Sequence, residues 1–142
     1  MGLYEIESGQ ILLNGKNLTR LYDQIKVGYV PQTSNIYSRE SEDFNFTLNE
    51  KSRDTKLSNS IFDININENN KYSGGEQKRI GLYRAIYDDP KILILDEYST
   101  GLDDLNLKHS LELLKSLSKT IIFITHDKRI MDMCDREYKL YG

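Results

Sequence analysis

The sequence predicts an α/β fold in which a mostly parallel sheet is flanked by helices. Two short apolar runs, Ile92–Leu95 and Thr120–Thr125, have the length and composition of strands buried on both faces of a parallel sheet. A segment with helical apolar spacing precedes each run, and strands that alternate with helices are typical of this class.

The composition limits the class of protein. The chain has 142 residues, a formal charge of −3 and one cysteine, Cys134, which indicates a single domain with a thin core and no internal disulfide framework. The slight acidic excess gives no reason to expect nucleic acid as a partner. No apolar run approaches the roughly 20 residues that cross a bilayer. With no secretory leader pattern at Met1, we expect a cytoplasmic setting.

The first elements read as β structure. Ile11–Leu13 is followed by Asn14-Gly15, a dipeptide that tolerates positive φ at both positions, so a hairpin or tight strand exit is predicted. A second strand is expected at Ile25–Val30. Pro31 ends it, because proline cannot donate to a ladder and holds the preceding residue extended.

Residues 33–71 differ in character from what precedes them. Polar residues dominate and apolar ones are scattered, which favours a mobile, partly helical subdomain. The polar stretch Asn65–Asn70 reads as a linker into the next helix. We expect the remaining residues, 72–142, to continue the α/β core.

A helix is predicted to begin at Ser73. Ser73 and Glu76 have the Ser-x-x-Glu spacing of a capping box, in which each side chain accepts from the other residue's backbone amide. Apolar residues then recur at helical spacing, and Pro90 limits the helix, so it should run to about Tyr87.

The C-terminal elements complete the alternation. Lys91–Glu97 is an apolar strand that ends in two acids. Leucines at 107, 111, 114 and 117 mark one face of a helix, which leads to the second apolar strand. A last helix and a short strand around Tyr138–Tyr141 are expected after it.

Polar side chains of interest follow these strands. Ligands bind at the carboxyl ends of parallel strands, where Asp96 and Glu97 lie, and neighbouring residues there point in different directions. One acid could hold Mg²⁺ while the other polarises a water. His126 ends the second strand, and Gln32 ends the Ile25–Val30 strand. Each residue taken alone has a simpler explanation. The two acids could form a solvated turn with no catalytic role, and the histidine could be an ordinary loop residue.

Ser73-Gly74-Gly75 adds a possible phosphate site. Two glycines allow close backbone approach, and the unpaired first-turn amides and the helix dipole favour an anion. An ordinary capped helix is the competing interpretation for this tripeptide by itself.

Taken together, these segments resemble the ATP-binding cassette (ABC) ATPases. In the family's terms they are similar to the glutamine loop, the signature motif, Walker B with its catalytic glutamate, the D-loop and the switch histidine. Five segments carry the resemblance in that order: Val30–Gln32, Tyr72–Gln77, Ile92–Glu97, Ser99–Asp103 and Ile124–Asp127. The resemblance covers nearly the whole chain and implies a P-loop NTPase-like fold.

The sequence departs from the family pattern in two ways. Tyr72 and Glu76 replace the usual Leu and Gln of the signature. The only Gly-Lys pair, Gly15-Lys16, lacks the rest of a Walker A loop, G-x-x-x-x-G-K-[ST]. We therefore expect residues 1–142 to be a partial nucleotide-binding domain whose N-terminal part is missing, with weak ATP binding alone and poorly covered apolar strand faces such as Ile92–Leu95.

The resemblance also implies a role for each site residue. Glu97 would polarise the attacking water, Asp96 would serve Mg²⁺, and His126 and Gln32 would contact the γ-phosphate, the water or the metal. A second cassette, identical or different, would pair head to tail with this one. Asp103 would couple the two sites across the interface. The signature residues expected to contact the partner's ATP are Ser73, Gly74, Gly75 and Glu76.

Three functions fit these motifs. We favour the ATPase subunit or domain of a membrane transporter, with residues 32–71 docked on its transmembrane partner at the cytoplasmic side of the membrane. A soluble cassette protein that acts on ribosomes or DNA is one alternative, although the interval from Gln32 to Ser73 has no room for a long coiled coil. A non-catalytic remnant or regulatory module is the other, and the presence of Glu97 and His126 speaks against it.

Overall fold

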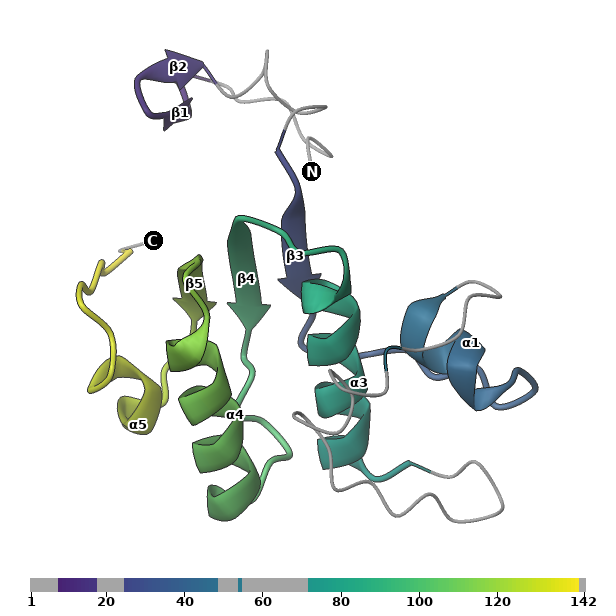
Figure 1. The fold of residues 1–142 in the computed structure, drawn as a ribbon. Helices are drawn as coiled ribbons and strands as arrows, with labels where there is room; N and C mark the ends of the chain where they lie inside the picture. Colours follow the sequence, from purple (N-terminus) through teal and green to yellow (C-terminus); the bar gives the residue numbers. More distant parts are fainter. Residues whose placement is uncertain (1–7, 18–24, 49–53, 55–71, 141–142) are drawn as a thin grey trace.

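The computed structural model describes residues 8–17, 25–48, 54 and 72–140. Their main feature is a three-stranded parallel sheet with the order β3-β4-β5. β3 spans Val27–Val30, β4 spans Ile92–Asp96 and β5 spans Thr120–Ile124. The register pairs Val27 with Ile92 and Ile92 with Thr120, so all three strands begin together, and β3 ends one residue before the other two (Figure 1).

The predicted N-terminal hairpin is confirmed. β1 (Leu12–Leu13) pairs antiparallel with β2 (Lys16–Asn17). Between them Asn14 has φ 50° and Gly15 has φ 76°. Positive φ at both central residues is what a two-residue turn of this kind requires, and Asn-Gly adopts it at low cost.

The helix predicted from the capping box is also confirmed. α3 spans Gly74–Tyr87, and its cap has both reciprocal hydrogen bonds. The Glu76 N–H donates to Ser73 Oγ at 3.3 Å, and the Ser73 N–H donates to Glu76 Oε2 at 2.6 Å. α4 (Asp104–Ser116) and the short α5 (Lys128–Met131) follow β4 and β5.

The main core lies between the sheet and its helices. It joins Leu82 and Ile86 of α3 to Leu93 of β4 and to Leu107 and Leu114 of α4. Gly28 of β3 lies under α3, and a Cβ at this position would overlap the carbonyl oxygen of Ala85. Glycine thus lets the helix approach the strand closely.

A second core cluster ties the 33–48 segment to α3. It contains Phe46 of α1 (Glu42–Thr47), Ile80 and Tyr83 of α3, and Tyr72. The Phe46 and Tyr83 rings meet edge to face at 5.0 Å. α1 is the helix that the structure describes within residues 33–48, so the subdomain expected over residues 33–71 stays a prediction, and the linker Asn65–Asn70 lies outside the described residues.

Two expectations are wrong. The strands are not buried on both faces: Leu93 and Leu95 of β4 are buried and alternate with half-buried residues, whereas β5 alternates half-buried residues with exposed ones, among them Ile122 and Ile124 at 46% and 52%. Both α3 and α4 pack on the face that carries Leu93, and no described helix covers the other. The strand expected around Tyr138–Tyr141 is also absent over residues 138–140, which have no regular structure. No helix in the described ranges is long and apolar enough to cross a bilayer.

Candidate functional site

Side chains predicted to act together come from the carboxyl ends of the three parallel strands. β3 leads into Gln32, β4 into Asp96 and Glu97, and β5 into His126. α3 and α4 begin at this same end of the sheet (Figure 1). Their N-cap residues, Ser73 and Asp103, therefore lie on the same side of the molecule. The parallel register therefore places candidate site residues from segments far apart in sequence at the same edge of the sheet.

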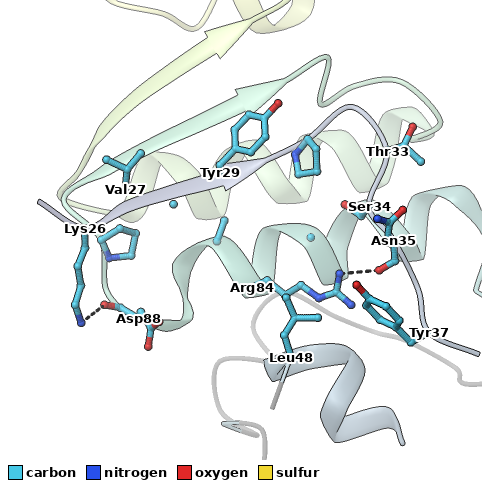
Figure 2. Close-up of a pocket in the computed structure, with 15 residues that line it drawn as sticks. Lys26, Val27, Tyr29, Thr33, Ser34, Asn35, Tyr37, Leu48, Arg84 and Asp88 are labelled. Carbon is cyan, nitrogen blue, oxygen red and sulfur yellow. Dashed lines mark hydrogen bonds between the residues drawn. The ribbon is translucent and has the colours of Figure 1, made fainter. Parts of the chain in front are cut away.

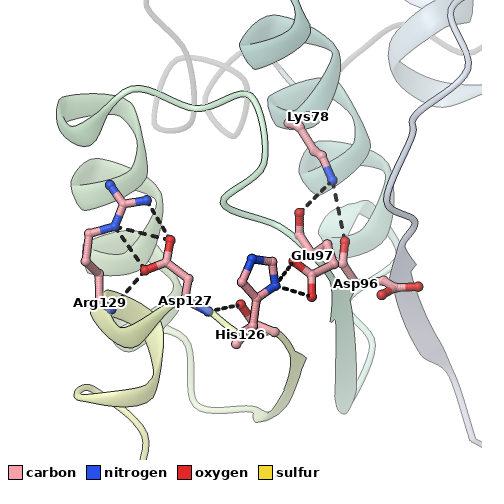
Figure 3. A network of polar contacts seen from close by, with 7 residues as sticks. Lys78, Asp96, Glu97, His126, Asp127 and Arg129 are labelled. Atoms are coloured by element: carbon pink, nitrogen blue, oxygen red, sulfur yellow. Dashed lines mark hydrogen bonds and ion pairs between the residues drawn. The ribbon is translucent and has the colours of Figure 1, made fainter.

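Glu97 and His126 are in direct contact at this edge. His126 Nδ1 lies 3.1 Å from Glu97 Oε1 and 3.0 Å from Oε2. The imidazole is 88% exposed, whereas the glutamate side chain is 22% exposed. Figure 3 shows the ring beside the carboxylate, with Nδ1 directed at its two oxygens. A largely enclosed carboxylate beside an open imidazole could hold a water or an anionic group from solvent.

The backbone of Glu97 has an unusual conformation at the end of β4. Its φ is 43°, a left-handed conformation that non-glycine residues rarely adopt and that costs roughly 1–3 kcal/mol. The Glu97 N–H donates to the Ile124 carbonyl at 2.8 Å, and Glu97 O accepts from the Thr100 N–H at 3.1 Å. These contacts hold the turn in place at the end of β4.

Asp96 points the other way. Its Oδ2 accepts from the Tyr29 hydroxyl at 3.1 Å, across the β3–β4 pair. Burial and the adjacent Asp96 carboxylate raise the pKa of Tyr29. The prediction that the two acids diverge is confirmed, because one carboxylate faces β3 and the other faces β5 (Figure 3).

The other predicted site residues do not join the Glu97–His126 pair. Gln32 is exposed beyond the end of β3. Ser73 and Gly74 are exposed at the start of α3, and Gly74 has no atom within 4 Å of an added Cβ. Gly75, in contrast, lies close to the loop after β4. A Cβ added to Gly75 would lie 3.4 Å from the Gly101 carbonyl oxygen.

Asp103 caps α4. Its Oδ1 accepts from the Asn106 N–H at 2.8 Å and its Oδ2 accepts from Asn106 Nδ2 at 2.6 Å, and these hydrogen bonds lower the pKa of Asp103. Arg79 Nη1 of α3 donates to Asn106 Oδ1 at 2.9 Å. The starts of α3 and α4 are thus connected through one amide side chain.

Sequence reasoning missed the group that fixes the loop after His126. Asp127 caps α5 and accepts from Arg129 Nη2 at 2.6 Å. The hydrogen bond from the Arg129 guanidinium holds the pKa of Asp127 well below its usual range. Arg129 also pairs with Asp104 at the start of α4. An Asp-x-Arg spacing before a helix was the available signal.

Lys78 was missed as well. It is 4% exposed, and its ammonium donates to three backbone carbonyls, those of Pro31 at 3.3 Å, Asp96 at 3.4 Å and Glu97 at 3.1 Å. Its place one turn before Leu82 on the buried face of α3 is the signal that could have identified it.

Comparison with known proteins agrees with this geometry. The model of the family described as "ABC transporter" matches residues 1–100, which is more than half of the chain. The chain belongs to the ABC transporter family. The resemblance inferred from the five segments is therefore confirmed.

Two curated relatives have names that describe ATP-binding import proteins. The chain is 32% identical to "Methionine import ATP-binding protein MetN 2" of Oenococcus oeni, an alignment that covers 89% of this chain and 40% of that protein. It is 33% identical to "Molybdate/tungstate import ATP-binding protein WtpC" of Methanocaldococcus jannaschii, covering 89% of this chain and 47% of that one. The chain thus spans less than half the length of these two ABC relatives.

Solved structures show the same fold. A bacterial Atm1-family ABC exporter with ATP bound superposes with a TM-score of 0.74 and 22% identity, over 93% of this chain and 27% of the exporter. A dimeric ATP-binding cassette with ADP and phosphate bound gives a TM-score of 0.68 and 21% identity, over 90% and 67%. These likenesses confirm the predicted α/β fold.

Proposed function

We propose that this chain forms part of the ATP-hydrolysing site of an ABC transporter. The observation that carries the proposal is the Glu97–His126 pair, built at the carboxyl edge of the parallel sheet. Family membership supports the same reaction, and the import proteins named above support transport as its purpose.

Glu97 is the proposed general base. Its side chain is mostly enclosed but meets the open imidazole of His126, so a water at this point would contact both groups. A carboxylate within hydrogen-bond reach can take a proton from the attacking water. His126 would orient Glu97 and contact the γ-phosphate, and Gln32 would reach the same region from the end of β3.

Mg²⁺ is the proposed metal, held by Asp96 together with ATP phosphates and with Gln32. The Asp96 carboxylate lies at the carboxyl end of β4 and accepts a hydrogen bond from the Tyr29 hydroxyl. Mg²⁺ commonly uses one or two carboxylates and completes its shell with phosphate and water. Within the described residues no three His, Cys, Asp or Glu side chains gather around one metal position. When bound, the ion would neutralise phosphate charge.

A second cassette is the proposed partner for the start of α3. Ser73 and Gly74 are exposed there, and the helix dipole and open first-turn amides favour an anionic phosphate. Glu76 is engaged in the cap, so its part is to hold Ser73 rather than to meet the phosphate directly. Asp103 would link the two sites across the interface.

A transmembrane partner is proposed to dock on the 33–71 subdomain. Its described part borders a pocket of about 490 Å³ between β3 and α3, where Thr33, Tyr37 and Leu48 lie (Figure 2). Arg84 of α3 donates to the carbonyls of Asn35 and Asn45, both at 2.7 Å, and so fastens this segment to the core. Docking would hold the cassette at the cytoplasmic side of the membrane.

The test is MgATP hydrolysis by the assembled ATPase, meaning this chain together with the partners that co-purify with it. The assembly is isolated from cells in which the chromosomal copy of this chain carries an affinity tag. Isolates from untagged cells provide the background. Hydrolysis above that background, lost when EDTA removes Mg²⁺, is expected. The proposal fails if the tagged assembly shows no Mg²⁺-dependent hydrolysis.

A further inference from the structure

A buried lysine, Lys78, lies next to the carboxyl ends of β3 and β4, where the candidate site residues are. Lys78 occupies the second turn of α3, and its side chain runs toward the end of β4 (Figure 3). Its Nζ donates to Glu97 O at 3.1 Å, to Pro31 O at 3.3 Å and to Asp96 O at 3.4 Å. An ammonium has three N–H donors, so three carbonyls use its full capacity.

These carbonyls belong to the turns that carry the predicted site residues. Pro31 immediately precedes Gln32, and the other two carbonyls belong to the acids themselves. At the ends of β3 and β4 the ladder stops, so carbonyls there need another partner when buried. One side chain therefore connects both strand ends to the helix that begins at Ser73.

Burying a lysine ammonium costs free energy unless hydrogen-bond acceptors or opposite charges compensate for the lost hydration. Burial lowers the pKa of Lys78, while the carboxylates of Asp96 and Glu97 act in the opposite direction. An apolar side chain of the same length would fill the space without that cost, but it would remove the lysine hydrogen bond from all three carbonyls and leave Glu97 O with only its bond from the Thr100 N–H. The left-handed turn at Glu97 would then lose one of its fixed contacts.

We propose that Lys78 is a positioning residue: it fixes the turns that carry Gln32 and Glu97, and so keeps the Glu97 carboxylate against His126. The catalytic consequence of this role rests on the function proposed above, whereas the positioning itself does not. The hydrogen bonds of Lys78 go to backbone carbonyls and to none of the reacting atoms.

The first test uses the wild-type chain without nucleotide. NMR of the ¹⁵N-labelled lysine ammonium groups should show slow proton exchange for Lys78, because its three donors are engaged and buried. Lys108, whose side chain is 72% exposed on α4, is the reference for rapid exchange. Exchange of Lys78 as rapid as that of Lys108 would overturn the proposal whether or not any variant folds.

The second test compares Lys78→Met with Lys78→Gln, which retains two donors, and with Lys108→Met as the matched control. In folded Lys78→Met, the ring ¹⁵N signals of His126 should move toward their positions in Glu97→Ala, and the amide signal of Glu97 should shift from its wild-type position. Lys78→Gln should restore part of both changes. A purely structural lysine would lower Tm and leave the His126 signals unchanged, and that result contradicts the proposal.

The third test measures turnover by the assembled ATPase. Lys78→Met should lower kcat by at least about tenfold, since small misplacement of a reacting group has effects of that size or larger, while KM for MgATP changes less than about twofold. Unchanged kcat would overturn the catalytic part of the inference. If even the wild-type assembly hydrolyses no ATP, the proposed function fails, and the two NMR tests still decide the positioning role.

Discussion

His126 Nδ1 lies 3.0 Å from Glu97 Oε2 although the two residues belong to different strand ends, 29 positions apart. The parallel register explains the contact. Asp96 is paired with Ile124, so the residues that follow each strand leave the sheet side by side. The Glu97 N–H bond to the Ile124 carbonyl then fixes their separation.

His126→Ala should separate function from stability. The ring is 88% exposed, so the free energy of unfolding should change by no more than about 0.5 kcal/mol. Turnover by the assembled ATPase should fall by about 10²-fold, because an oriented hydrogen-bond partner of the base and phosphate is lost. The control is His109→Ala, an exposed change on α4. Equal turnover in the two variants would remove His126 from the site.

Gly74→Ala should be tolerated by the fold but not by the nucleotide. No atom lies within 4 Å of the added Cβ, and alanine is favourable in a helix. Urea unfolding should therefore give a midpoint at or slightly above that of wild type. The methyl group would stand between the first-turn amides and a partner's phosphate, so ATP-dependent pairing of cassettes, followed by gel filtration, should weaken. Pairing that persists at wild-type ATP concentrations would argue against a phosphate site at this helix start.

Gly28→Ala should have the opposite effect. The added Cβ would overlap the Ala85 carbonyl oxygen and the Leu93 side chain, which forces β3 and α3 apart. Overpacking of this kind costs about 1–3 kcal/mol, and a backbone neighbour that cannot rotate away favours the upper end. Urea unfolding measures the loss, with Gly74→Ala as the reference. An unchanged midpoint would show that β3 and α3 are farther apart than described.

Tyr98 should make stability depend on alkaline pH. Its hydroxyl is buried and donates to Ser110 Oγ at 3.0 Å, and burial raises the pKa of Tyr98 to about 12 despite that bond. An unfolded tyrosine ionises near pH 10. The folded-state pKa is raised, so its contribution is complete below pH 10 and is lost as pH rises through 12, a decline of about 2–3 kcal/mol.

Tyr98→Phe should remove that extra decline, at a cost of about 1 kcal/mol near neutral pH for the lost hydrogen bond. Tyr138→Phe is the control, since Tyr138 is 78% exposed. Unfolding free energies compared from pH 8 to pH 12 test the difference. Parallel curves for wild type and Tyr98→Phe would contradict a buried, un-ionised phenol.

Local patterns predicted several elements closely. The start of α3 at Ser73 and its end at Tyr87 follow from a reciprocal cap and a nearby Pro90, both of which act within a few residues. The β1–β2 turn follows from Asn14-Gly15 for the same reason. The shared edge for Glu97 and His126 could also be predicted, because two parallel strands leave little choice of position.

Features that depend on distant packing could not be predicted. Nothing in the sequence near Lys78 shows that two strand ends would supply its carbonyl partners. Apolar composition suggested burial of β5 on both faces, but composition alone does not tell whether helices cover one face or two. A strand at Tyr138–Tyr141 needs a neighbour to pair with, and residues 138–140 have no ladder partner in the described structure.

Steady-state ATP hydrolysis by the assembled ATPase carrying Glu97→Gln tests the central claim most directly. Glutamine keeps the size and the contact with His126 but cannot accept a proton from water, so turnover should fall by at least about 10²-fold while ATP-dependent pairing of cassettes remains. Glu112→Gln, on the exposed face of α4, should hydrolyse ATP at the wild-type rate. Turnover by Glu97→Gln equal to that of Glu112→Gln would show that Glu97 is not the base.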